Sequence, residues 1–135
     1  ENGGHAYHAT MPTDAIKLFR DTINETAEFG FDRARNKQQE LGDRVRELLK
    51  KHHFISVAGE GFHAPGVVVS YTSDKNIHNG SKFKELGMQI AAGVPLKCDE
   101  AKDYQTFRLG LFGLDKLKNV DSCIEKLEKI INKIT

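Results

Sequence analysis

Apolar residues recur at helical spacing in two stretches that open the chain and in one that closes it. The pattern predicts a helix over residues 13–28, a second over about 32–52 and a last one over about 119–134. Gly30 is typical of a helix end and separates the first two. The stripe of the first helix comprises Ile16, Phe19, Ile23 and Ala27.

The period changes in the middle of the chain, where short runs of β-branched and aromatic residues lie between turn residues. Residues 67–71 are the clearest strand, and we expect further strands over 54–58 and 106–113. Residues 94–96 suit an edge strand, because a proline within them cannot donate to a central ladder. A third helix is expected over about 81–88.

Short polar side chains stand where several helices should begin. We expect Asp32 and Ser81 to cap the second and third helices, and Asn119 or Asp121 to cap the last. Pro12 suits the start of the first helix.

The order of these elements argues for an α+β fold. Short strands alternate with helices in a way that favours two layers, with a small, mainly antiparallel sheet of about three to four strands and helices on one face. No internal repeat and no second core stand out, so we expect one compact part after an irregular leader that ends near Met11.

Composition narrows the classes of function. The 135 residues are 39% hydrophobic and 29% charged, which is typical of a soluble globular domain. Twenty basic residues oppose nineteen acidic ones, so we expect no nucleic-acid partner. No apolar run is long enough for a membrane span. The two cysteines, Cys98 and Cys123, indicate free thiols and a cytoplasmic location.

Glu1 stands where a start methionine would be, so we expect a processed chain or a piece of a longer one. The sequence shows no signal peptide.

Arg108 is the most informative single residue, because it is a guanidinium within an apolar run. On a strand it should face away from Phe107 and Leu109. Two interpretations remain open. The arginine forms a structural ion pair across the sheet, or it clamps the carboxylate or phosphate of a ligand through two parallel hydrogen bonds.

The leader offers a weaker signal. Tyr7 and Thr10 place two hydroxyls three residues apart, which suits phosphate oxygens. His5 and His8 have the spacing of metal ligands, but no cluster nearby supplies a third and a fourth ligand, so we expect no metal site. The glycine-rich stretch 59–66 matches no phosphate-binding pattern. No complete set of catalytic residues is present in this sequence.

Four segments, taken with their spacing, resemble a known family. They are residues 3–16 (GGHAYHATMPTDAI), 60–72 (EGFHAPGVVVSYT), 87–99 (GMQIAAGVPLKCD) and 107–121 (FRLGLFGLDKLKNVD). Together they look like the C-terminal part of class V pyridoxal-phosphate aminotransferases, of the alanine–glyoxylate and serine–pyruvate type. The resemblance extends over essentially the whole chain.

The resemblance implies a domain organisation. Residues 1–12 would be an interdomain segment with the cofactor-phosphate motif, and residues 13–135 would be the small C-terminal domain. The Schiff-base lysine of the family lies upstream of the matched region. This piece alone would therefore hold no catalytic residue and would be inactive.

The resemblance also implies roles for three residues. Arg108 matches the arginine that binds the substrate α-carboxylate. Tyr7 and Thr10 match hydroxyls that reach the cofactor phosphate of the neighbouring subunit, which makes a homodimer functional. The partners implied are an N-terminal large domain and a second identical subunit.

The implied reaction is transfer of an amino group from alanine or serine to a 2-oxo acid such as glyoxylate or pyruvate, with pyridoxal 5'-phosphate as cofactor. The alternative is a stand-alone α+β module that binds a small anion or a protein partner. As an isolated piece of such an aminotransferase, the domain should expose an apolar face where the large domain and the partner subunit pack, and the candidates for this face are Phe31, Phe62 and Phe112.

Overall fold

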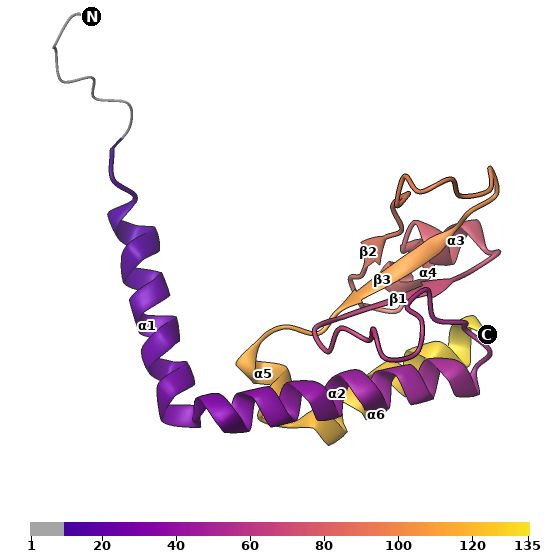
Figure 1. Ribbon diagram of the computed structural model, residues 1–135. Coiled ribbons are helices and arrows are strands. Elements are labelled where there is room, and N and C mark those ends of the chain that lie inside the picture. The colour runs from indigo at the N-terminus through magenta and orange to yellow at the C-terminus, as the bar shows by residue number, and fades with distance from the viewer. Residues whose placement is uncertain (1–9) are drawn as a thin grey trace, which may run out of the picture. The chain divides into compact units, whose positions relative to one another are not determined.

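The computed structural model describes residues 10–135, which form two compact units (Figure 1). The first unit runs to Phe31 and the second from Asp32 to Thr135. Helix α1 (Thr13–Phe29) belongs to the first unit and begins after Pro12, as predicted. It ends at Gly30, which has a positive φ of 96° that a side chain would disfavour. No residue of α1 is buried, so its apolar stripe is exposed.

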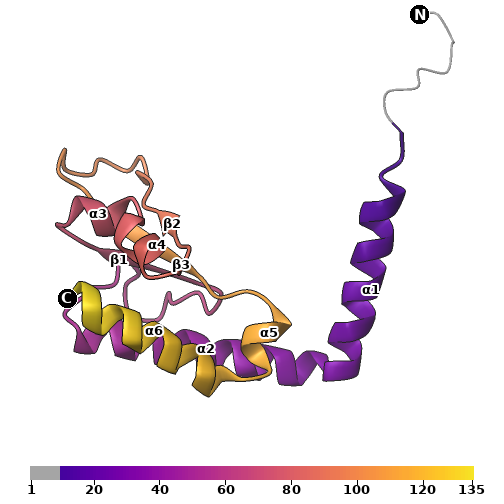
Figure 2. The same cartoon turned by 180° about the vertical axis from the view of Figure 1, so that it is seen from behind.

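Two long helices form one layer of the second unit. Helices α2 (Phe31–Lys51) and α6 (Val120–Ile134) lie side by side in both views (Figures 1 and 2). Ion pairs join them at 2.6 Å between Arg44 and Asp121 and at 3.3 Å between Lys51 and Glu128. The apolar faces of both helices are buried, with Leu41, Val45, Leu48 and Leu49 on α2 and Val120, Leu127, Ile131 and Ile134 on α6.

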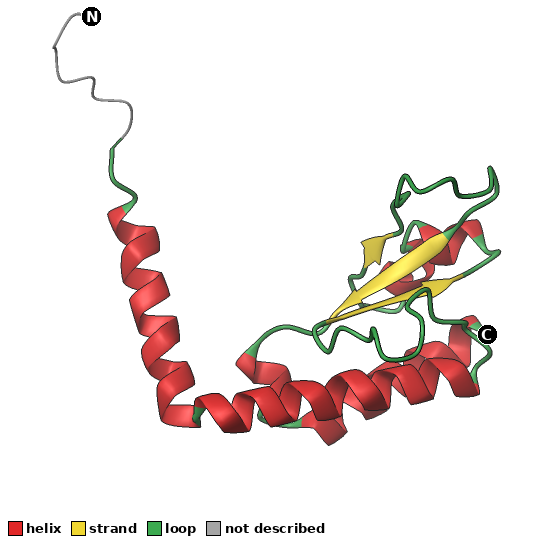
Figure 3. Cartoon of the chain, viewed as in Figure 1, coloured by secondary structure: helices red, strands yellow, loops and turns green. Residues whose placement is uncertain are grey.

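The second layer is a three-stranded antiparallel sheet (Figure 3). Its strands are β1 (Val67–Tyr71), β2 (Ala91–Ala92) and β3 (Thr106–Gly110), in the order β1-β3-β2. The central strand is therefore the last one in the sequence, and both neighbours pair with it in antiparallel register. The predicted fold class, a small antiparallel sheet with helices, is confirmed.

The two faces of the sheet differ in burial. Phe107 and Leu109 on β3, and the residues opposite them on β1, are buried. The Phe107 ring contacts Phe54 at a centroid distance of 5.1 Å and Phe83 of helix α4 (Ser81–Glu85) at 5.8 Å. Arg108 and Gly110 alternate with these residues and point to the opposite face. One face thus holds the core and the other carries Arg108.

Several predicted elements differ from those observed. Residues 54–58 do not form a strand of their own. Ser56 forms an isolated bridge with Ser70, where the Val57 amide donates to the Val69 carbonyl oxygen at 3.0 Å and the Tyr71 amide to the Ile55 carbonyl oxygen at 2.9 Å. The edge strand lies at β2 rather than at 94–96. Strand β3 ends at Gly110 rather than at 113.

Two short helices, α3 (Lys75–His78) and α5 (Leu114–Leu117), were not predicted, because four residues are too few to show a helical period.

The caps were predicted in part. Asn119 caps α6 by accepting a hydrogen bond from the Ser122 amide at 3.0 Å. Asp32 does not cap α2, which already begins at Phe31. Gly80 takes the position before α4 in a left-handed conformation, and Ser81 is the first residue of that helix. No helix among residues 10–135 is both long and apolar enough to cross a bilayer.

The packing of α2 on the segment before β1 depends on a glycine. A Cβ atom at Gly42 would lie 2.7 Å from the Pro65 carbonyl oxygen and 2.9 Å from its Cα. Both contacts involve backbone, which moves only if the whole segment shifts.

We therefore expect Gly42→Ala to lower the free energy of unfolding by about 1 to 2 kcal/mol, although alanine is the better helix former. Urea unfolding measures this change. The matched control is Gly59→Ala, since a Cβ atom there meets no heavy atom within 4 Å. A Gly42→Ala chain as stable as wild type would contradict the close packing described here.

Candidate functional site

Arg108 lies at the middle of the central strand. Val69 of β1 is opposite it on one side and Ala91 of β2 on the other. The arginine is partly buried, whereas Phe107 and Leu109 on either side of it are buried in the core. The predicted orientation of Arg108, away from its apolar neighbours, is therefore confirmed. The small side chain of Ala91 leaves room beside the guanidinium.

The guanidinium is held by backbone and not by an acid. Its Nε donates a hydrogen bond to the Ala92 carbonyl oxygen at 2.8 Å. Among residues 10–135, no carboxylate oxygen comes within the 4.0 Å of an ion pair with Arg108. A structural ion pair within the described chain is thus excluded. Because Nε is occupied, Nη1 and Nη2 remain to bind an anion end-on.

The leader is described only from Thr10, which is exposed. Tyr7, His5 and His8 lie outside the described residues, so the pairing of Tyr7 with Thr10 stays a prediction. Within residues 10–135 there is no group of three His, Cys, Asp or Glu side chains that could hold a metal.

Both cysteine thiols are free, as predicted. Cys98 is exposed and Cys123 half-buried. Burial raises the pKa of Cys123, which disfavours a reactive thiolate there.

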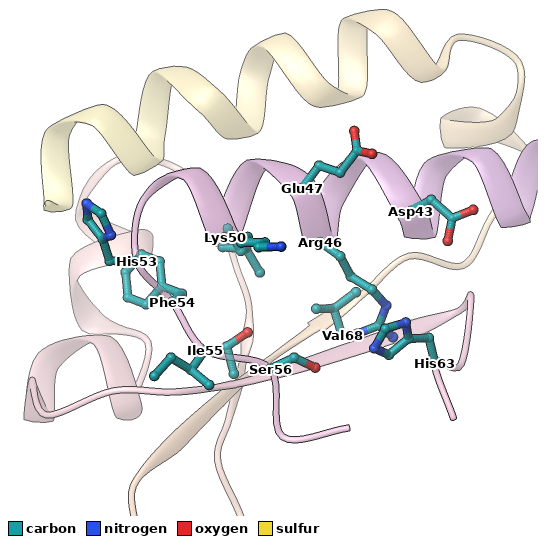
Figure 4. Close-up of a pocket in the computed structure, with 12 residues that line it drawn as sticks. Asp43, Arg46, Glu47, Lys50, His53, Phe54, Ile55, Ser56, His63 and Val68 are labelled. Atoms are coloured by element: carbon teal, nitrogen blue, oxygen red, sulfur yellow. The ribbon is translucent and has the colours of Figure 1, made fainter. Parts of the chain in front are cut away.

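A cavity of about 810 Å³ opens between the C-terminal half of α2 and the segment before β1 (Figure 4). Its wall includes Leu49, Phe54 and Val68, with Arg46 and His63 on the rim. Arg46 is tied to backbone, since its Nη2 donates to the carbonyl oxygens of Ala64 at 2.7 Å and Val67 at 3.1 Å. Burial lowers the pKa of Arg46. Val68 belongs to the core face of the sheet, so this cavity does not adjoin Arg108.

A second cavity, of about 300 Å³, lies at the β2 edge of the sheet. His78, Gly93, Tyr104 and Thr106 contribute to its wall. Sequence reasoning did not identify these residues as a site, because they come from three separate segments. The one available signal was spacing. Residues two apart along a strand face the same side, and this spacing separates Tyr104 from Thr106 and Thr106 from Arg108.

Three of the predicted apolar surface residues are exposed. Phe31 is 60% exposed, Phe62 84% and Phe112 65%. They lie on a helix and two separate loops, so they do not by themselves define one patch.

Comparison with known proteins gives a structural likeness without a sequence match. No protein-family model matches the chain, and no curated protein matches it. The fold is similar to that of an alanine–glyoxylate aminotransferase from Nostoc sp., with a TM-score of 0.68 and 17% identity over 96% of this chain. An aspartate aminotransferase of subgroup IV from Thermus thermophilus gives 0.50, with 16% identity over 73%.

The likeness extends over a minor part of each enzyme. The chain spans 34% of the Nostoc protein and 27% of the Thermus protein. Identities this low establish the fold alone. The resemblance that the sequence motifs indicated is therefore confirmed at the level of fold: the chain has an α+β fold similar to part of the fold of these two aminotransferases.

Proposed function

We propose that this chain is the C-terminal domain of a pyridoxal-phosphate-dependent aminotransferase, and that Arg108 binds the α-carboxylate of its substrates. The observation that carries the proposal is the state of Arg108. Its guanidinium is oriented by the Ala92 carbonyl oxygen and has no carboxylate partner among the described residues. An arginine without an acidic partner leaves its Nη donors available to an anionic ligand, which can bind them through charge-assisted hydrogen bonds.

The geometry favours one binding mode. A carboxylate that meets Nη1 and Nη2 end-on forms two parallel charge-assisted hydrogen bonds. The bond from Nε to Ala92 fixes the plane of the guanidinium before the ligand arrives, so little side-chain freedom is lost on binding. Arg108 then sets the orientation of the bonds at the substrate α-carbon, which is a contribution to catalysis by positioning.

The cofactor, when bound, takes up the electron pair that is released at the substrate α-carbon. The described residues fit this cofactor in one respect, because the exposed Thr10 hydroxyl is of the right kind to donate to a phosphate oxygen. We propose that Tyr7 and Thr10 bind the phosphate of the cofactor in a second identical subunit. The lysine that carries the cofactor would lie in an N-terminal large domain, and the 135-residue chain alone would be inactive.

The sequence motifs favour alanine or serine as amino donor and glyoxylate or pyruvate as acceptor. A protein in which this chain follows a cofactor-binding domain tests the proposal. We expect it to retain pyridoxal phosphate on purification and to convert alanine and glyoxylate to pyruvate and glycine. Failure to bind the cofactor would leave the alternative of a stand-alone anion-binding or interaction module.

Arg108→Lys tests the role of the guanidinium. Lysine keeps the charge but loses the planar pair of donors, so we expect KM to rise about 10- to 100-fold for both amino donor and oxo acceptor. Steady-state kinetics of the two half-reactions measure this. The matched control is Arg35→Lys, at an exposed position of α2. Unchanged kinetics in Arg108→Lys would remove Arg108 from the substrate site.

Tyr7→Phe and Thr10→Val test the phosphate motif. Each change removes one hydrogen bond to an anion, so we expect the Kd of the cofactor to rise about 5- to 30-fold. Titration of the cofactor-free enzyme with pyridoxal phosphate measures it. Tyr71→Phe removes a hydroxyl outside the motif and serves as control. Equal affinities in all the variants would show that the motif does not bind the phosphate.

A further inference from the structure

The small cavity at the β2 edge lies close to Arg108, as residues of both β2 and β3 show. Ala92, whose carbonyl oxygen holds the Arg108 side chain, is followed directly by Gly93 in the cavity wall. On β3, Thr106 lies two residues before Arg108 and faces the same side of the sheet. Two residues of strand span about 7 Å. A ligand held by Arg108 is therefore within reach of this cavity.

Two hydroxyl groups in the cavity wall are buried and have no partner beyond each other. Thr106 is 1% exposed, and its hydroxyl lies close enough to the Tyr104 hydroxyl to share a hydrogen bond with it. Neither Oγ1 of Thr106 nor Oη of Tyr104 has another hydrogen-bonding partner within residues 10–135. When one hydroxyl donates to the other, the hydrogen of the second is left without an acceptor, and a buried donor of this kind points to a ligand that accepts it.

The Tyr104 phenol is kept neutral. Burial is the largest cause of a raised pKa for this phenol, and an electrostatic contribution from the neighbouring Tyr71 raises the pKa further. A hydrogen bond with the Thr106 hydroxyl offsets part of this rise. The phenol therefore remains protonated at neutral pH and can donate a hydrogen bond as well as accept one.

The third polar group of the wall is the ring of His78. Its Nδ1 lies 2.7 Å from the Thr106 carbonyl oxygen. Since a carbonyl oxygen only accepts, Nδ1 donates this hydrogen bond, and Nε2 is the ring nitrogen that remains for a ligand. The wall thus presents two hydroxyls and one ring nitrogen.

The cavity wall carries one negative and one positive side chain. The Glu100 carboxylate accepts hydrogen bonds from the backbone amides of Leu96, Lys97 and Cys98, and these and its own amide lower its pKa. It is therefore charged at neutral pH. Lys102 supplies one positive charge to the same wall. With one charge of each sign, the cavity has no net preference for an anion or a cation.

Gly93 keeps the cavity wall close to Thr106. A Cβ atom at this position would collide with the carbonyl oxygen and the hydroxyl of Thr106. The chain therefore passes over Thr106 without a side chain, and the cavity has a fixed shape on this side.

We propose that this cavity receives the side chain of amino donors larger than alanine and selects, among these, the ones whose side chain ends in an uncharged hydrogen-bonding group, a hydroxyl or an amide. The inference deepens the proposed function and depends on it, because the α-carboxylate must be held by Arg108. The ligand group would exchange hydrogen bonds with the Tyr104 and Thr106 hydroxyls and the His78 ring.

The test compares two amino donors of equal length in the cofactor-loaded full-length enzyme. L-Homoserine ends in a hydroxyl and L-norvaline in a methyl group. We expect kcat/KM to be at least about 10-fold higher for homoserine. Thr106→Val and Tyr104→Phe should each lower the value for homoserine about 10-fold or more and leave norvaline within about twofold.

Further variants separate this role from a structural one. Thr106→Ser keeps the hydroxyl and should keep the preference for homoserine. Thr135→Val removes a hydroxyl at the end of α6 that donates a hydrogen bond to the Ile131 carbonyl oxygen, and should change the kinetics of neither donor. Thermal unfolding of each variant shows whether it is folded, and Tyr104→Phe carries the test if Thr106→Val does not fold.

Two outcomes would overturn the inference in different ways. An enzyme that transfers amino groups from alanine but treats homoserine and norvaline alike, before and after substitution, would refute the cavity's role and leave the proposed function intact. An enzyme that transfers no amino group from any donor would refute both.

Discussion

The structure depends on the alternation of side chains along one central strand. In β3 the apolar residues Phe107 and Leu109 anchor the core, and the polar and small residues between them point the other way. Because β3 is paired on both sides, its register is fixed by two neighbours at once. A slip by one residue would bury the Arg108 guanidinium and expose the Phe107 ring. The packing that stabilises the fold therefore also positions the candidate ligand-binding group.

The same alternation explains why the candidate site lies on one face. The Phe107 ring contacts Phe54 and Phe83 of α4 on the core face of the sheet. The opposite face has Arg108 in its middle, with the small residue Ala91 beside it. The division into a core face and a face that carries Arg108 is what a small domain needs if it contributes one arginine to a site completed elsewhere.

Much of this fold could be predicted from the sequence because its long elements have clear periods. The three long helices show apolar spacing of about 3.6 residues, and the two five-residue strands are short runs of β-branched or apolar residues. Gly30 and Asn119 mark helix ends by known chemistry. The failures concern elements too short to show a period, namely α3, α5 and β2. The segment at 54–58 has the composition of a strand, but only Ser56 finds a bridging partner.

The candidate site was predictable only where one residue was chemically conspicuous. Arg108 stands out because a charge interrupts an apolar run, and the structure shows it without an acidic partner in the described chain. The cavity beside it gave no such sign, since His78, Tyr104 and Thr106 are ordinary residues in sequence, and His78 meets the other two only when α3 packs against β3. Its distinguishing property, two buried hydroxyls with no partner beyond each other in the described chain, exists only in three dimensions.

The most direct test of the account is the visible absorbance of the full-length protein during the two halves of one reaction cycle. If this chain is an aminotransferase domain, the purified protein is yellow with bound pyridoxal phosphate. Adding L-alanine alone abolishes the colour as the cofactor takes up the amino group, and adding glyoxylate restores it. A protein that binds no cofactor, or whose absorbance is unchanged by alanine and by serine, would contradict the central claim.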